Sequence, residues 1–145
     1  MRYVLWIARL LLGAPFVVFG LNTLMWSLGY DPLMEPPQEM PEAAQKFMDA
    51  MTDAGFMHPL RGGAELAGGF MVLTGLFLPL GLVVLAPIVV HIVLYHHFLD
   101  PSGTIIAYVI LALEVFLALA YLSQFRGVLH PWPKSPWNGS GSDPA

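Results

Sequence analysis

The sequence predicts an all-α, polytopic membrane protein, in which four transmembrane helices form a bundle and one short amphipathic helix lies outside the membrane. Of its 145 residues, 57% are hydrophobic and only 11% are charged, whereas an ordinary soluble domain carries roughly 25% charged residues. A chain of this length has too little interior to hide so much apolar surface from water, and a bilayer removes that need. Four apolar segments also approach the length of about 20 residues that crosses the hydrocarbon core.

The four predicted spans are separated by turn signals. They cover residues 3–28, 62–78, 80–98 and 104–123. Pro79 and Gly81, with no charge between them, predict a tight hairpin between the second and third spans. The sequence DPSG at 100–103 predicts a turn before the fourth. The first apolar run is too long for a cleaved signal peptide, and no small-residue cleavage site follows it.

The positive charges predict the orientation of the spans. Arg2, Arg9, Arg126 and Lys134 fall on the side of the N-terminus, and Lys46 and Arg61 fall on the other side. Positively charged residues concentrate in cytoplasmic loops. We therefore expect both termini to be cytoplasmic.

The domain that contains the spans covers residues 1–129 and includes an external loop, residues 29–60. Pro41 suits a first helical turn, Glu42 suits the positive end of a helix, and Gly55 suits a C-terminal cap, so a helix is expected over residues 42–54. Phe47 and Met51 lie at helical spacing on its apolar face, which we expect to rest on the outer membrane surface or on the bundle. A mobile loop helix is the alternative.

The tail, residues 130–145, is rich in Pro, Gly and Ser and carries Trp132 and Trp137. Such a composition favours disorder in isolation. The two tryptophans and the 42–54 helix are the surfaces through which we expect other membrane subunits to bind. The lipid bilayer is the other expected partner, whereas a net charge of −4 and only six Lys and Arg residues argue against nucleic acid.

Polar side chains at membrane depth are the candidates for chemistry, because ionisable groups there are costly and need partners. Their depth separates them into an outer group and a central pair. The outer group is Asn22, Arg61, Glu65, His96 and His97, and the central pair is His91 and Glu114. His91 and Tyr95 are four residues apart and therefore share one helix face.

An acid, a histidine and a tyrosine around an apolar slot are suited to bind a quinone, since imidazole hydrogen-bonds a carbonyl and a carboxylate accepts protons. The candidate catalytic residues are Glu65, His96, His91 and Glu114, and the candidate quinone contacts are Asn22, Glu65, Tyr95 and His96. In a purely structural alternative, Arg61 and Glu65 form an ion pair on one helix face, and Glu114 tethers its helix to His91.

Other chemistries are disfavoured. The sequence has no cysteine, which excludes disulfides, thiolate nucleophiles and iron–sulfur clusters held by cysteine. No metal site is expected, because His91, His96 and His97 have no second ligand cluster of recognisable spacing. A haem clamped by two histidines would need them on two spans, and only one span carries histidine. The spans show no internal repeat, which disfavours a transporter.

Small residues at the start of the second span predict close helix packing. Gly63 and Ala67, and likewise Ala64 and Gly68, are four residues apart, which lets a neighbouring helix approach. The spacing does not match a dinucleotide-binding fingerprint, and no strand precedes it.

Three runs resemble the DoxX family of small bacterial membrane proteins, as does the sequence FGLN at 19–22. The runs are RGGAELAGGFMVLTG at 61–75, LAPIVVHIVLYHHFLDP at 85–101 and LEVFLALAYLSQFRGVL at 113–129. The resemblance covers most of residues 3–129. It implies a four-helix bundle in the bacterial inner membrane, and some relatives are subunits of a thiosulfate:quinone oxidoreductase. Asn22, Glu65, His96 and Asp100 match the polar pattern of the family, whereas His91 stands where relatives often carry Asn.

Two functional hypotheses follow. In the first, the chain is a non-catalytic accessory subunit of a larger respiratory or photosynthetic redox assembly, because catalytic candidates are few. In the second, it is a quinone-linked oxidoreductase subunit that uses Glu65 and His96.

Overall fold

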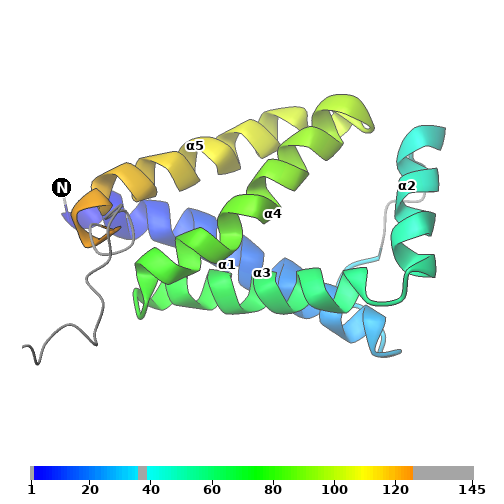
Figure 1. Cartoon of the computed structure of the whole chain (residues 1–145), viewed down its shortest axis with the longest axis horizontal. Coiled ribbons are helices and arrows are strands. Elements are labelled where there is room, and N and C mark those ends of the chain that lie inside the picture. The colour runs from blue at the N-terminus through cyan, green and yellow to red at the C-terminus, as the bar shows by residue number, and fades with distance from the viewer. Residues whose placement is uncertain (1, 36–38, 126–145) are drawn as a thin grey trace, which may run out of the picture.

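The computed structural model describes residues 2–35 and 39–125, and the regular secondary structure of this part of the chain is all helical, with no strand (Figure 1). The five α-helices are α1 (Arg2–Ser27), α2 (Glu42–Asp53), α3 (Met57–Thr74), α4 (Leu78–Phe98) and α5 (Thr104–Ala120). Two short 3₁₀ helices, η1 (Pro101–Gly103) and η2 (Leu122–Phe125), flank α5. The all-α class predicted from the sequence is confirmed.

The four long helices form a closed bundle. Along the chain, α1 packs on α3, α3 on α4, α4 on α5, and α5 returns to contact α1. In Figure 1, α2 stands at one end of this bundle and the N-terminus lies at the other. We refer to these as the α2 end and the N-terminal end.

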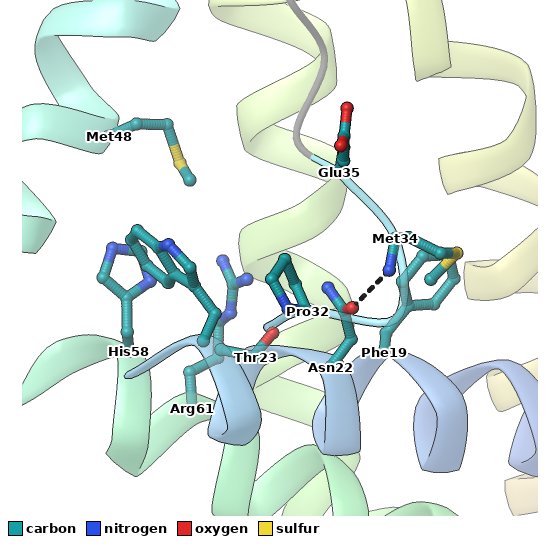
Figure 2. Close-up of a pocket in the computed structure, with 10 residues that line it drawn as sticks. Phe19, Asn22, Thr23, Pro32, Met34, Glu35, Met48, His58 and Arg61 are labelled. Carbon is teal, nitrogen blue, oxygen red and sulfur yellow. Dashed lines mark hydrogen bonds between the residues drawn. The ribbon is translucent and has the colours of Figure 1, made fainter. Parts of the chain in front are cut away.

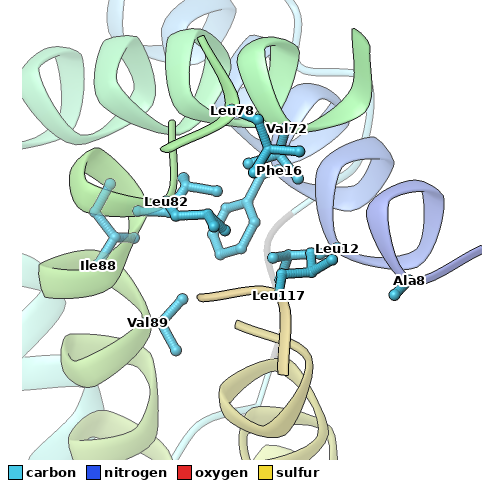
Figure 3. Packing of buried hydrophobic residues seen from close by; sticks show 10 residues of the cluster. Ala8, Leu12, Phe16, Val72, Leu78, Leu82, Ile88, Val89 and Leu117 are labelled. Carbon is cyan, nitrogen blue, oxygen red and sulfur yellow. The ribbon is translucent and has the colours of Figure 1, made fainter. Parts of the chain in front are cut away.

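The core is apolar and lies between the four long helices (Figure 3). Its fully buried large side chains are Leu12, Val72, Leu82, Leu85, Val89 and Leu117. Outside the core, large apolar side chains are exposed on every long helix; Phe98 and Ile105, for example, are 72% and 81% exposed. Exposed apolar surface on this scale is unusual for a soluble monomer and fits contact with lipid.

Within residues 2–35 and 39–125, three helical segments are long and apolar enough to cross a membrane, by length and composition: Arg2–Ser27, Leu78–Phe98 and Pro101–Ala120. Helix α3 is not among them. Its first half carries His58, Arg61 and Glu65, which lower its hydropathy. The structure therefore confirms long apolar helices that are candidates for membrane spans, while the count of four spans and the external position of α2 stay predictions.

The turn between α3 and α4 lies at residues 75–77, and not at Pro79 and Gly81 as the sequence predicted. Helix α3 ends because Gly75 adopts a left-handed conformation with φ 81°, which glycine tolerates best. Pro79 instead lies in the first turn of α4, where its missing N–H costs nothing. Gly81 packs against α3, and a Cβ atom there would lie 2.8 Å from Cβ of Met71.

Helices α1 and α3 approach each other through glycines spaced seven residues apart on each helix. Gly13 faces Gly69, and Gly20 faces Gly62. A Cβ atom at Gly20 would lie 2.5 Å from the backbone nitrogen of Leu66. The predicted close contact of Gly68 is confirmed against Leu85 of α4, whereas Gly63 has no neighbour within 4 Å of a built Cβ.

Arg9 also joins α1 to α3, at the N-terminal end of the bundle. Its Nε and Nη2 atoms donate hydrogen bonds of 3.0 Å each to the carbonyl oxygens of Val72 and Leu73. These carbonyls belong to the last turn of α3 and have no partner within that helix. A positive charge is favourable at this end of a helix, so the environment of Arg9 compensates for its position in an apolar helix.

Candidate functional site

The ion pair of Arg61 and Glu65 lies in the first half of α3, one helical turn apart. Nε of Arg61 is 3.2 Å from Oε1 of Glu65, as the structural alternative predicted. Glu65 is only 4% exposed, and its Oε2 atom has no hydrogen-bond partner among the described residues. A buried carboxylate is costly unless a cation balances it, so Arg61 is the group that makes this position tolerable.

Arg61 also borders two cavities. The first, which we call the loop cavity, has a volume of about 360 Å³ and lies between α1, the loop after it, α2 and α3. The second, which we call the bundle cavity, has a volume of about 340 Å³ and lies mainly between α1, α4 and α5. Nε of Arg61 is buried and, apart from its ion pair with Glu65, has no hydrogen-bond partner among the described residues, while the Arg61 side chain lines both cavities.

The loop cavity combines aromatic, sulfur and polar side chains (Figure 2). Its lining residues are Phe19, Asn22, Thr23, Trp26, Pro32, Met34, Glu35, Met48, His58 and Arg61. Oδ1 of Asn22 accepts a 2.7 Å hydrogen bond from the backbone N–H of Met34, another lining residue (Figure 2). Asn22 thus holds the loop that follows α1.

The bundle cavity is almost entirely apolar. Its lining residues are Leu12, Pro15, Phe16, Phe19, Arg61, Ile92, His96, Gly103, Ile106, Ala107 and Ile110. Two of them carry polar groups on the side chain, Arg61 and His96. Phe19 and Ile106 are 52% and 67% exposed, so the cavity opens toward the apolar surface of the bundle.

His96 is held in one orientation by the turn that follows α4. Its Nδ1 atom lies 2.9 Å from the backbone oxygen of Asp100. A carbonyl oxygen only accepts, so Nδ1 carries the proton and donates, which leaves Nε2 of a neutral ring as an acceptor. The hydroxyl of Thr104 donates to the backbone oxygen of His96 at 3.0 Å, and a Cβ atom at Gly103 would overlap the imidazole ring.

Asp100 organises the same turn. Its carboxylate accepts a 3.1 Å hydrogen bond from the backbone N–H of Ser102 and thereby caps η1. Hydrogen bonding to Ser102 lowers the pKa of Asp100 below its ordinary value of 3.8, because the bond favours the ionised form. The position of Asp100 in the polar pattern of the sequence thus has a structural explanation.

His91 and Tyr95 contact α2 and line neither cavity. The ring of Phe47 in α2 lies 5.6 Å from that of His91 and 6.0 Å from that of Tyr95. The hydroxyl of Tyr95 donates to the sulfur of Met40 at 3.8 Å. Phe47 of α2 therefore packs on α4.

The structure does not join the predicted central pair. In the part of the chain that is described, no hydrogen bond or ion pair links Glu114 to His91. Glu114 faces a groove between α4 and α5, whereas His91 contacts Phe47. His97 is exposed, and its Nδ1 atom lies 3.3 Å from the hydroxyl of Tyr108, so it takes no part in either cavity.

The sequence analysis missed His58, which precedes the predicted second span. This side chain is buried, its Nε2 atom lies 3.2 Å from the hydroxyl of Thr52, and its ring contacts Trp26 edge-on at 4.8 Å. His58, Arg61 and Glu65 recur at helical spacing, a signal that would have extended the helix toward Met57.

Within the described residues, no group of three His, Cys, Asp or Glu side chains is placed to hold a metal ion.

The fold and the site define a class, namely a small all-helical membrane protein with buried polar side chains toward the α2 end of an apolar bundle and one further buried acid, Glu114, apart from them. The family model for DoxX matches residues 4–98, from α1 to the end of α4. The chain belongs to the DoxX family. No curated protein and no solved structure matches it.

Proposed function

We propose that the chain is an accessory subunit of a bacterial membrane redox assembly and that it holds the headgroup of a quinone in the bundle cavity. The observation that carries the proposal is the composition of this cavity, which is apolar throughout except for Arg61 and His96. Ligand sites of this kind are typically mostly apolar, with a few placed polar groups, and have volumes of about 300–1,000 Å³.

The residues of the cavity fit a quinone or quinol headgroup. The N–H groups of the Arg61 guanidinium, which lines the cavity, suit a carbonyl oxygen of the quinone. The acceptor Nε2 of neutral His96 suits the hydroxyl of a quinol, because Nδ1 is already committed to Asp100. An apolar isoprenoid chain has a route to lipid past Phe19 and Ile106, which are exposed at the rim. A bound quinone would supply two-electron, two-proton redox chemistry.

The chain's own contribution would be to bind and orient this headgroup and to manage one proton. Arg61 would fix one oxygen, while its ion pair with Glu65 keeps the guanidinium in place. His96 would accept a proton from the quinol at Nε2. The resulting imidazolium would keep its Nδ1–H hydrogen-bonded to the backbone carbonyl of Asp100. Because the sequence has no cysteine for a thiolate or an iron–sulfur cluster, the electrons that the quinol gives up along with its protons would pass to a partner subunit.

The proposal includes a topology. Helices α1, α3, α4 and α5 would each cross the bacterial inner membrane, with both termini in the cytoplasm and α2 on the outer side. The polar residues of α3 support a membrane-spanning α3. They line the loop cavity or the bundle cavity, or take part in the ion pair of Arg61, instead of facing lipid. The 42–54 helix, together with Trp132 and Trp137 of the tail, would contact the partner; the tail lies outside the residues that the structure describes.

The test is quinone binding by the purified full-length chain in lipid nanodiscs, with His96→Ala and the matched variant His97→Ala. Loss of one hydrogen bond of about 1.4 kcal/mol corresponds to a tenfold weaker Kd. We therefore expect His96→Ala to weaken binding of a short-chain quinol about tenfold and His97→Ala to leave it unchanged. Equal affinities of the two variants would contradict the proposed site. Quinol oxidation by the chain alone would instead favour the oxidoreductase alternative.

A further inference from the structure

Glu114 of α5 is a second buried acid, and the function proposed above does not use it. The residue is 6% exposed, and its Oε2 atom has no hydrogen-bond partner among the described residues. Arg61 balances Glu65, but no cation of the described chain lies within ion-pair distance of Glu114. An unpaired carboxyl inside an apolar helix bundle is costly and calls for an explanation.

Glu114 lines a groove of about 320 Å³ between α4 and α5, which we call the Glu114 groove. Apart from Glu114, its lining consists of Leu, Val and Ala side chains of the two helices and the ring of Phe125 in η2. No other titratable or charged side chain from α4, α5 or η2 lines it in the described part of the chain. The groove shares no lining residue with the bundle cavity.

The groove is open on the side that faces away from the core. Val83, Val90 and Val115, which line it, are all exposed. These positions belong to the apolar surface that contacts lipid in the proposed topology, so a molecule dissolved in the membrane can reach Glu114 without crossing the bundle.

Two features of the lining specify the ligand. The acid has one stable state without a ligand, in which it keeps its proton, because a lone carboxylate in hydrocarbon is unfavourable. An organic cation would compensate the ionised form, and the face of an aromatic ring such as Phe125 attracts cations as well. The remaining Val, Leu and Ala side chains fit apolar substituents. The groove therefore favours large, weakly hydrated cations over small inorganic ones.

We propose that the Glu114 groove binds a lipophilic organic cation in exchange for the proton of Glu114. The protonated acid releases one proton to solvent as the cation enters, and the product is a carboxylate paired with the cation, so charge balances. Binding therefore weakens as the pH falls, because protons compete with the ligand for the same carboxylate. No bond within the ligand forms or breaks.

The experiment uses tetraphenylphosphonium as the probe and the full-length chain in nanodiscs of neutral lipid, with calorimetry as the readout. We expect saturable 1:1 binding, with one proton released per cation when titrations in buffers of different ionisation enthalpy are compared. Glu114→Gln should abolish saturable binding. Glu42→Gln, which alters an exposed carboxyl of α2, should bind as the wild type does.

A neutral probe separates charge from shape. Triphenylphosphine oxide has similar aromatic groups and a hydrogen-bond acceptor but no net charge, so we expect at least tenfold weaker binding. Equal binding of the two probes to the wild type, or unchanged tetraphenylphosphonium binding by Glu114→Gln, would overturn the proposal. Absence of binding to the wild type would overturn it too, and would favour a neighbouring transmembrane helix as the occupant.

A measurement on the wild type avoids dependence on the folding of Glu114→Gln. Dicyclohexylcarbodiimide is apolar and adds to a protonated carboxyl, forming an acylisourea that rearranges to a stable N-acylurea. Peptide mass spectrometry should locate this adduct at Glu114, and saturating tetraphenylphosphonium should prevent it. Labelling that persists at full occupancy of the cation would place the cation elsewhere and contradict the inference.

Discussion

Arg61 and Glu65 are joined by an ion pair of 3.2 Å that lies mostly out of contact with solvent. A second pair with the same i, i+4 spacing, Glu42 with Lys46 on α2, is 2.5 Å long, but its side chains are 83% and 74% exposed. The two pairs differ in environment more than in geometry. Exposed pairs contribute little to stability, whereas removing one member of a buried pair leaves an uncompensated charge.

This difference predicts opposite outcomes for two matched substitutions. Glu65→Ala should lower the free energy of unfolding by about 3 kcal/mol, because Arg61 loses its buried partner. Glu42→Ala should change it by less than about 1 kcal/mol. Thermal unfolding in mild detergent measures both, and a double variant Arg61→Ala, Glu65→Ala should recover part of the loss. Equal effects of the two single substitutions would show that the α3 pair is solvated.

The glycines of the α1–α3 contact give a second matched prediction. Gly20→Ala should destabilise the bundle by about 2 kcal/mol, because its Cβ would lie 2.5 Å from the backbone nitrogen of Leu66 and close packing resists added volume. Gly63→Ala should stabilise α3 by up to about 1 kcal/mol, since alanine is the better helix former and nothing lies within 4 Å of its Cβ. Melting temperatures that shift in the same direction for both would contradict the helix contact.

Local features of this fold could be predicted from the sequence, because they depend on residues near in the chain. The helices, the pair of Arg61 with Glu65 and the short helix α2 follow from spacing and capping alone. The turn at 75–77 was misplaced because Pro79 is equally suited to a turn and to the first turn of a helix. The start of α3 was placed too late because charge near Arg61 resembled the end of a span.

Features that depend on tertiary packing could not be predicted in the same way. The seven-residue spacing of Gly13 with Gly20 is visible in the sequence, but the partner helix that it faces is not. Depth placed Glu114 beside His91, whereas the rotation of α5 directs the acid toward the first half of α4. Glu65 and Glu114 are both buried, and the depth of a residue in the membrane does not reveal which of the two acids has a cation as its neighbour.

Arg9 provides a third prediction, at the N-terminal end of the bundle. Arg9→Gln should lower the free energy of unfolding by about 2–3 kcal/mol, because it weakens two charge-assisted hydrogen bonds to the last turn of α3. Arg2→Gln is the control, since Arg2 is exposed and should have little effect on stability. Unfolding in detergent compares the two, and a smaller loss for Arg9 than for Arg2 would contradict the proposed capping role.

The topology leads to a fourth prediction, which reporter fusions test. A fluorescent protein fused after Ala145 should fluoresce in the cytoplasm, and alkaline phosphatase inserted near Pro37 should be active, which requires the outer side of the membrane. The bias of Arg and Lys toward the side of the N-terminus is the physical reason. An active phosphatase at Ala145, or an inactive one near Pro37 in a stably expressed fusion, would contradict four spans with cytoplasmic termini.

The last prediction separates an accessory subunit from an oxidoreductase. If partners bind through Trp132 and Trp137, truncation after Leu129 should release the chain from its assembly while the bundle still inserts, because buried aromatic anchors often contribute about 2 kcal/mol or more each. Pull-down with the full-length and truncated chains, each in mild detergent, measures the release.

The double variant Glu65→Gln, His96→Ala should stay in the assembly. Its rate of electron transfer should fall below that of the wild type only because quinone binds more weakly, so excess quinone should restore the rate. A truncated chain that remains bound, together with a double variant that excess quinone fails to rescue, would favour an enzyme that uses Glu65 and His96 directly.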